Sequence, residues 1–288
     1  MKAEPLEAER RETARRHLDS AEAWLRRLID YQLTAAFGAD YWDADISGEP
    51  LIKPRVKKQV ADRRAAEPAR YSRNLDAMQL PEAIGIVLHP RLYAAHFRAA
   101  LVRAYPDDGQ PEARTFLNRL NDHRNRLSHV GTCSQRDLEQ CVCYSNDLVD
   151  SLKLFFRDEL MDRVFNVPTF SRVVDNRGNE KQLSPTAPNR EMQAFDFRGG
   201  EKADLYPGDM LEVEVEVDES FSGYTVQWMT FSSDRGDGPI MQVLIEPKHV
   251  GLYLVVRFEV TSGESWHRLH GGVDDRLELR YRVLPPVQ

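Results

Sequence analysis

An arginine, an asparagine and a histidine lie close together in the chain, as Arg124, Asn125 and His129. They supply a permanent cation, an amide and an imidazole that titrates near neutral pH. A guanidinium binds phosphate oxygens in a bidentate manner, and an imidazole can take or return the proton of a ribose hydroxyl. These residue types can therefore cleave RNA without a metal, through attack of the 2′-hydroxyl on the adjacent phosphorus.

Helical spacing separates the three side chains into two directions. Asn125 and His129 are four residues apart and share a face of a predicted helix. Arg124 lies about 140° away from His129 around the axis. The arginine must reach around the helix, or the helix must end near His129, and Gly131 suits such an end. One histidine cannot easily serve as both acid and base, so we expect a homodimer with two copies of His129 in one cleft.

The same spacing also fits proteins that cleave nothing. A histidine in the last turn of an exposed helix stabilises the helix dipole. On that interpretation the chain is a scaffold, a sensor or a partner protein, or it binds a nucleotide without cleaving it. We interpret the neighbouring His123 as a surface histidine rather than a second acid or base.

The net charge of −7 is unevenly distributed. Basic and acidic residues balance over 1–165, so the whole excess of acid lies in 166–288. Within the balanced part, residues 53–73 are strongly basic, with Tyr71 as their single aromatic residue, which makes base stacking there doubtful. A solvated face and an RNA-binding surface are about equally compatible with this stretch. The RNA-binding hypothesis takes in Lys53, Arg55, Lys57, Lys58, Arg63, Arg64 and Arg126.

Neither a metal nor another cofactor is predicted. Cys141 and Cys143 would point to different faces of a helix, which favours core thiols over a zinc site. His267 and His270 lie in a predicted loop that we expect to be solvated. The N-terminus lacks the apolar core of a signal peptide, and no apolar run approaches the roughly 20 residues that span a bilayer. We therefore expect a cytoplasmic protein with reduced cysteines and no membrane partner.

Apolar periodicity predicts an α+β multidomain protein. Helices are expected at 6–37, 80–88, 92–105, 111–131 and 134–164, which gives an all-α domain over 1–165. Residues 166–205 contain several prolines and glycines and are predicted to be a linker. Strict alternation at 211–217, followed by further short strands, predicts an all-β sandwich domain over 206–288.

The helical part resembles the HEPN superfamily of small helical nucleotide-binding domains. The resemblance rests on residues 23–29 (AWLRRLI), residues 39–42 (ADYW), the R-N-x-x-x-H motif at 124–129 and a long closing helix. It implies a metal-independent ribonuclease with Arg124 and His129 as the catalytic pair and Asn125 assisting. Many members are toxins or phage-defence effectors that act on RNA as dimers.

The C-terminal part resembles immunoglobulin-like modules of the polycystic-kidney-disease type. The residues that carry this are 207–211 (PGDML), Tyr224-x-Val226-x-Trp228 and Gly251-x-Tyr253. The resemblance implies a core tryptophan at 228 and a tyrosine-corner element at Tyr253. Such a module is expected to recognise a protein partner or to position a dimer, and to carry no chemistry.

Overall fold

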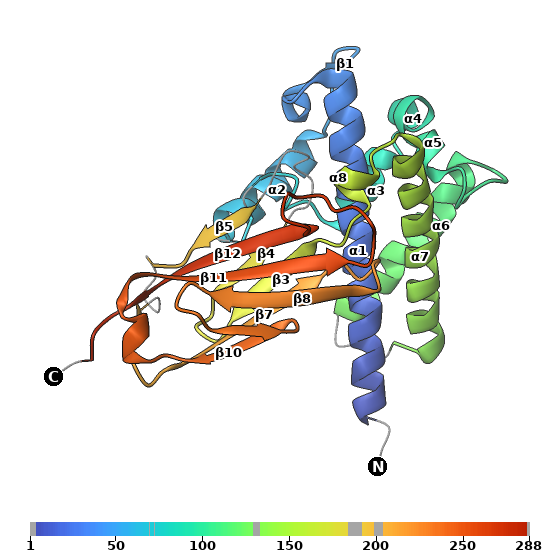
Figure 1. Cartoon of the computed structure of the whole chain (residues 1–288). Coiled ribbons are helices and arrows are strands. Elements are labelled where there is room, and N and C mark those ends of the chain that lie inside the picture. The colour runs from blue at the N-terminus through green and yellow to red at the C-terminus, as the bar shows by residue number, and fades with distance from the viewer. Residues whose placement is uncertain are drawn as a thin grey trace. The chain divides into compact units, whose positions relative to one another are not determined.

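The protein is described by a computed structural model that covers residues 4–68, 70–71, 73–128, 133–183, 192–198 and 204–286. It divides into two compact units, Met1–Asn166 and Val167–Gln288. The first unit is helical and the second is built from β-sheets, so the chain is a mixed α and β protein (Figure 1). Each unit is described by itself.

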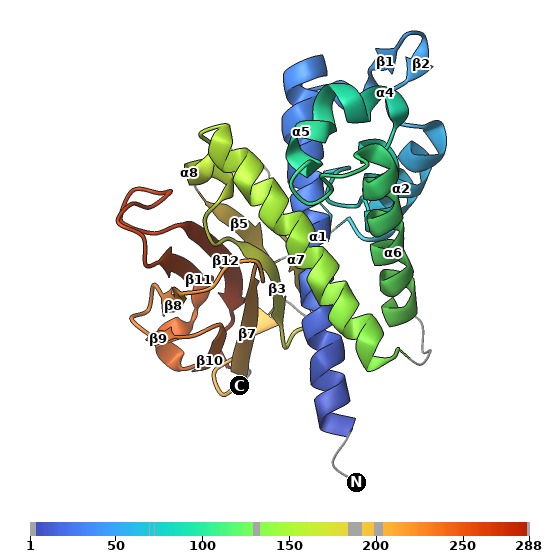
Figure 2. The same cartoon turned by 90° about the vertical axis from the view of Figure 1, so that its right-hand side faces the viewer.

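The first unit is organised around three long helices, α1, α6 and α7, which contact one another. Figure 2 shows α6 and α7 side by side. Trp24 of α1 and Phe156 of α7 bring their ring centroids within 5.9 Å in the core. The elements of this unit are α1 (Glu4–Phe37), η1 (Tyr41–Asp43), β1 (Asp45–Ile46), β2 (Glu49–Pro50), α2 (Pro54–Ala66), α3 (Leu80–Val87), α4 (Pro90–Leu92), η2 (Tyr93–Phe97), α5 (Arg98–Leu101), α6 (Gln110–Ser128), α7 (Gln135–Asp158) and α8 (Asp162–Phe165).

The single helix predicted at 92–105 is interrupted. A π-helical segment, η2, separates the short helices α4 and α5. A π segment adds a residue to the turn and rotates the residues that follow it. As a result Phe97, Ala100 and Leu101 are buried, whereas Val102 is 40% exposed.

The second unit consists of two sheets that enclose a core of aliphatic and aromatic side chains. One has the order β10-β7-β3-β4, and the other β5-β12-β11-β8-β9, with β6 also paired to β12. Strand β7 buries alternate residues, as its sequence predicts. The bounds are β3 (Phe170–Asp175), β4 (Glu180–Gln182), β5 (Gln193–Asp196), β6 (Asp204–Leu205), β7 (Met210–Val217), β8 (Tyr224–Thr230), β9 (Arg235–Asp237), β10 (Ile240–Leu244), η3 (Pro247–His249), β11 (Gly251–Ser262) and β12 (Asp275–Val283).

The prediction of a linker over 166–205 is wrong for much of that segment. Strand β3 lies inside a sheet, between β4 and β7, and its Phe170 is fully buried. Strands β5 and β6 pair in parallel with β12. The prolines and glycines of the segment suggested a linker. Its short strands form because they pair with strands that are distant in the sequence, β7 and β12.

Two aromatic residues of this unit do not take the positions that the sequence predicted for them. Tyr253 is 61% exposed and is not a corner tyrosine. The buried tyrosine hydroxyl belongs to Tyr281, which donates to Asp175 Oδ2 at 2.9 Å. Trp228 is only partly buried and packs against the edge of the core, where Gly236 lies so close that a Cβ would meet the indole at 2.3 Å.

Candidate functional site

Arg124 and Asn125 lie near the C-terminal end of α6, and both side chains are partly buried. Arg124 Nη1 donates to Asn125 Oδ1 at 3.4 Å, so the guanidinium and the amide are adjacent. His129 lies outside the described residues, and its relation to Arg124 therefore remains a prediction. The arginine–asparagine pair is the part of the motif that the structure describes.

The sequence of α6 explains why Arg124 is partly buried. Ala113, Leu117 and Leu120 are buried at the spacing of one helix face, and Arg124 continues that face by one further step. A long arginine side chain can lie along apolar surface while its guanidinium reaches polar groups. The guanidinium is thus held at the edge of the helical core.

Asp137, at the start of α7, joins the two helices that flank residues 129–132. It pairs with Arg126 of α6, and its Oδ1 lies 3.6 Å from Nδ1 of His123. Its other oxygen accepts hydrogen bonds from the hydroxyl and the backbone N–H of Ser134, and the two residues form a capping box at the start of α7. The hydrogen bond from the Ser134 hydroxyl lowers the pKa of Asp137, helped by the Arg126 charge. We name Asp137, Arg126 and His123 the α6–α7 tie.

His123 is buried, at 5% exposure, so its interpretation as a surface histidine is wrong. Its ring lies 6.2 Å from that of Tyr144. Burial lowers the pKa of His123, although Asp137 acts in the opposite direction. Within the described part of the chain, its buried Nδ1 has no hydrogen-bond partner. A neutral imidazole in this position is part of the helical core.

The basic residues predicted to bind RNA fall into three groups. Arg63 is structural, because it pairs with the buried Glu82 and donates to the Ala77 carbonyl at 2.6 Å. Two others are engaged and still accessible: Lys57 pairs with Asp43 at 2.9 Å, and Arg126 pairs with Asp137 while 53% exposed. The exposed members of the set on and beside α2 are Lys53, Arg55, Lys58 and Arg64.

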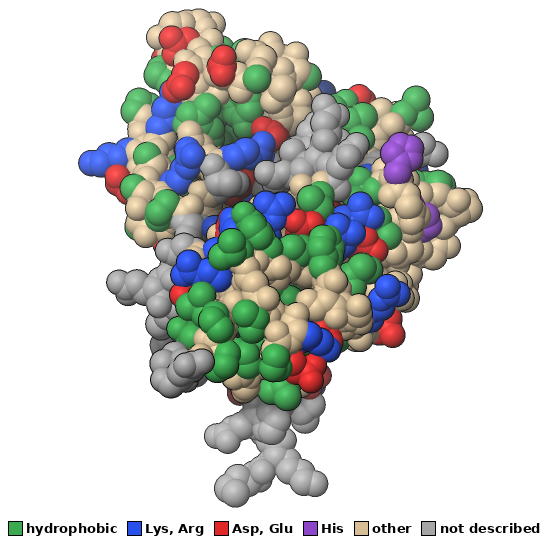
Figure 3. Space-filling model, turned by 60° about the vertical axis from the view of Figure 1, so that its left-hand side comes forward, with side chains coloured by type: hydrophobic (Ala, Val, Ile, Leu, Met, Phe, Trp, Pro, Cys, Tyr) green, Lys and Arg blue, Asp and Glu red, His purple; other side chains and the backbone are tan. Residues whose placement is uncertain are grey.

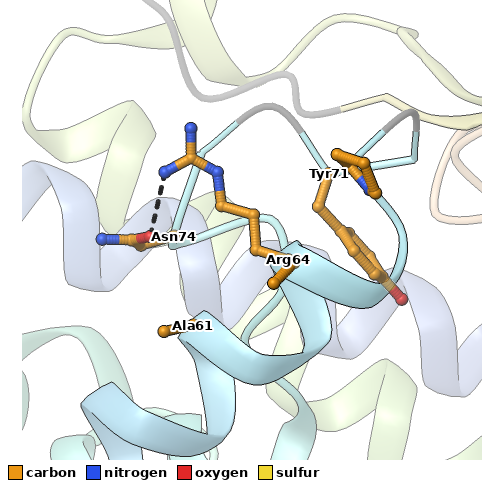
Figure 4. Close-up of a pocket in the computed structure, with 6 residues that line it drawn as sticks. Ala61, Arg64, Tyr71 and Asn74 are labelled. Atoms are coloured by element: carbon orange, nitrogen blue, oxygen red, sulfur yellow. Dashed lines mark hydrogen bonds between the residues drawn. The ribbon is translucent and has the colours of Figure 1, made fainter.

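A pocket lies beside the basic helix α2, and sequence reasoning did not predict it. Its volume is about 400 Å³, and it is lined by Ala61, Arg64, Ala65, Pro68, Tyr71 and Asn74. Figure 4 shows Arg64 extending from α2 toward Asn74, with Tyr71 on the other side. The single aromatic residue of the basic stretch was the only signal in the sequence that pointed to this place.

The loop before β12 and the cysteines of α7 are the remaining places where the sequence offers metal-ligand side chains. Buried Asp274 holds that loop by accepting N–H bonds from Ser262 at 2.6 Å and Arg268 at 3.2 Å, so the loop is not simply solvated. Cys141 is buried, and burial raises its pKa to about 12, whereas Cys143 is exposed. Over the described residues, no group of three or more His, Cys, Asp or Glu side chains is arranged to hold a metal ion.

Large apolar side chains are exposed on the second unit. Figure 3 shows hydrophobic side chains next to basic (Lys or Arg) and acidic side chains on the face that it draws. Aromatic residues and arginine are enriched in the centres of protein interfaces. The most exposed large apolar side chains of the unit are Leu252, Phe231, Tyr253, Leu244, Met210 and Ile240.

Among the helices that the structure describes, none combines the length and the apolar character needed to cross a membrane. No known family model matches the sequence, and no curated protein is significantly similar to it.

Proposed function

We propose that the protein is a metal-independent endoribonuclease. His129 takes the proton of the 2′-hydroxyl as that oxygen attacks the adjacent phosphorus, and Arg124 binds the phosphoryl oxygens that gain charge. The bond from phosphorus to the 5′-oxygen breaks, and that oxygen takes a proton from an acid. The products are a 2′,3′-cyclic phosphate and a free 5′-hydroxyl.

The adjacency of Arg124 and Asn125 is the observation that carries this proposal. Because Asn125 Oδ1 accepts from Arg124, the amide NH₂ is oriented as a donor. A guanidinium and an amide NH₂ at the end of one helix form a donor pair suited to a phosphate. The α6–α7 tie supports it further, since it holds together the two helices between which His129 lies in the sequence.

The proposal includes a homodimer and a HEPN-like arrangement of the helical unit. Two copies of His129 would supply the acid and the base that a single imidazole cannot supply together. The second unit would act as an immunoglobulin-like module that binds a protein partner, and its exposed apolar side chains support that role. The setting we propose is a cytoplasmic toxin or phage-defence system.

Cleavage of RNA in the presence of EDTA tests the assignment. We expect the purified protein to cut single-stranded RNA and to leave cyclic phosphate ends. Arg124→Ala and His129→Ala should each lower the rate at least about 100-fold, because removal of one transition-state donor or of the acid–base group typically costs that much. Sedimentation of the same sample should give the mass of a dimer.

Arg119→Ala is the matched control, since it removes the same charge from an exposed position on the same helix. Its cleavage rate should stay close to that of the unaltered protein. Unchanged cleavage by both Arg124→Ala and His129→Ala would refute the assignment. An unaltered protein that binds RNA but never cuts it would support the scaffold or sensor alternative instead.

A further inference from the structure

The pocket beside α2 has the chemistry of a nucleobase site. Its walls are apolar where Ala61, Ala65 and Pro68 line it, and Tyr71 adds an aromatic ring. Bases stack on such rings, and each stacking contact contributes roughly 1–3 kcal/mol to binding. The Arg70 guanidinium lies 5.4 Å from the centre of the Tyr71 ring, which places a further cation beside the stacking surface.

The polar side chains of the pocket offer donors. Arg64 Nη1 donates to Asn74 Oδ1 at 3.2 Å, which fixes the amide with its oxygen toward the guanidinium. The Asn74 NH₂ and the remaining N–H groups of Arg64 are then left as donors. No acidic residue is among the six that line the pocket. A ligand that contacts both side chains must present acceptors to them.

Guanine presents two adjacent acceptors, N7 and O6, on one edge. Adenine presents N7 beside an amino group, and uracil places an N–H donor between its two carbonyl acceptors, so each would set a donor against a donor. Cytosine has adjacent acceptors, but its single ring offers Tyr71 a smaller stacking surface than a purine does. We propose that this pocket binds a guanine base, stacked on Tyr71 and read by Arg64 and Asn74.

The surroundings favour a guanine that carries phosphate. Arg55 and Lys58 are exposed on α2, the helix that supplies three of the pocket residues. Basic side chains near a base site bind the phosphate of the same nucleotide without reading its sequence. The ligand is a guanine nucleotide, either free or within RNA. This inference does not depend on RNA cleavage, because a measurement of nucleotide binding is enough to test it.

Calorimetry with mononucleotides tests which base the pocket binds. The full chain with His129→Ala, which prevents turnover, is titrated with GMP, AMP, CMP and 7-deaza-GMP. We expect GMP to bind about tenfold more tightly than AMP or CMP, and 7-deaza-GMP to lose most of that advantage because it lacks the N7 acceptor. Two uridine oligonucleotides, one with a single guanosine and one with none, test whether the pocket binds guanine within RNA.

Tighter binding of the guanosine oligonucleotide than of GMP assigns the site to RNA, and the reverse order assigns it to the free nucleotide. Equal affinities for GMP and AMP, together with equal affinities for the two oligonucleotides, overturn the proposal. Binding of CMP as tight as that of GMP also overturns it. Failure of the cleavage test with retained guanine preference would reject only the ribonuclease assignment.

Variants identify the pocket as the place of binding. Tyr71→Ala removes the stacking ring and should weaken GMP binding at least about fivefold, whereas Tyr71→Phe keeps the ring and should weaken GMP binding by less. Asn74→Asp replaces the donor with an acceptor at nearly the same volume and should abolish the preference for guanine. Lys58→Gln removes a charge outside the pocket and should weaken GMP and AMP equally. Unchanged GMP binding by both Tyr71→Ala and Asn74→Asp would place the ligand elsewhere.

Discussion

At the scale of single residues, the two histidines of the motif region have different roles. His123 is buried against Tyr144 with a lowered pKa, so it is a neutral core group near pH 7. The acid–base role in the proposal therefore stays with His129. The proposal requires that cleavage depend on His129 and not on the protonation of His123.

His123 should make the protein less stable in mild acid. Its folded-state pKa is below the unfolded value of about 6.5, so the unfolded chain binds the proton more readily as pH falls. Its contribution to stability is present above a pH of about 6.5 and is lost below it. Urea unfolding at about pH 7 and about pH 5 should show a smaller loss of stability for His123→Phe than for the unaltered protein.

His17→Gln is the control for that comparison, because His17 is partly exposed on α1. It shows whether removal of a histidine that is not buried changes the loss of stability over the same acidification. If His123→Phe loses as much stability on acidification as the unaltered protein does, His123 does not titrate in this range.

At the scale of elements, the α6–α7 tie connects local capping to the site. Ser134 and Asp137 begin α7 with a capping box, and Asp137 also reaches Arg126 and His123 on α6. The same carboxylate thus starts one helix and positions the end of another. Its loss should affect both stability and the geometry of the motif.

Two substitutions separate these roles. Ser134→Ala and Asp137→Ala both weaken the start of α7 and should each cost about 1 kcal/mol of unfolding free energy, measured in urea. Only Asp137→Ala also releases Arg126. We therefore expect the rate of RNA cleavage to fall further in Asp137→Ala than in Ser134→Ala. Equal rates in the two variants would show that the tie has no effect on the site.

At the scale of the whole molecule, two units with separate cores make up the chain. The boundary lies at Asn166 and Val167, so the β-unit begins well before the alternating strand at 211–217. Strand β3 joins β7 to β4 inside one sheet, and Tyr281 of the other sheet donates to Asp175 of β3. The β-unit is incomplete without the residues before 206.

Two fragments test this boundary. Residues 167–288 should fold alone and unfold in one cooperative thermal transition, because they contain both sheets and their core. Residues 206–288 should show no cooperative transition, since they lack β3 and its buried Phe170. Circular dichroism during heating measures both. A cooperative transition in the shorter fragment would mean that β3 to β6 are dispensable.

The sequence by itself predicted the elements whose signals are local. Alternation at 211–217 predicted β7, and apolar periodicity predicted the helices at 6–37 and 134–164, which form as α1 and α7. These features depend on periodicity and on side chains within one turn of each other. The contact between Arg124 and Asn125 is not among these features, because helical spacing points neighbouring side chains in different directions.

Only the tertiary structure decided what depends on distant partners. Phe170 belongs to a core because β3 pairs with β7, and Arg63 is structural because Glu82 lies buried beside it. The burial of His123 and the pocket around Tyr71 arise from elements that meet in space. Local sequence determined the long helices and the alternating strand β7. Packing between remote segments determined strands β3, β5 and β6, and which polar side chains remain available for chemistry.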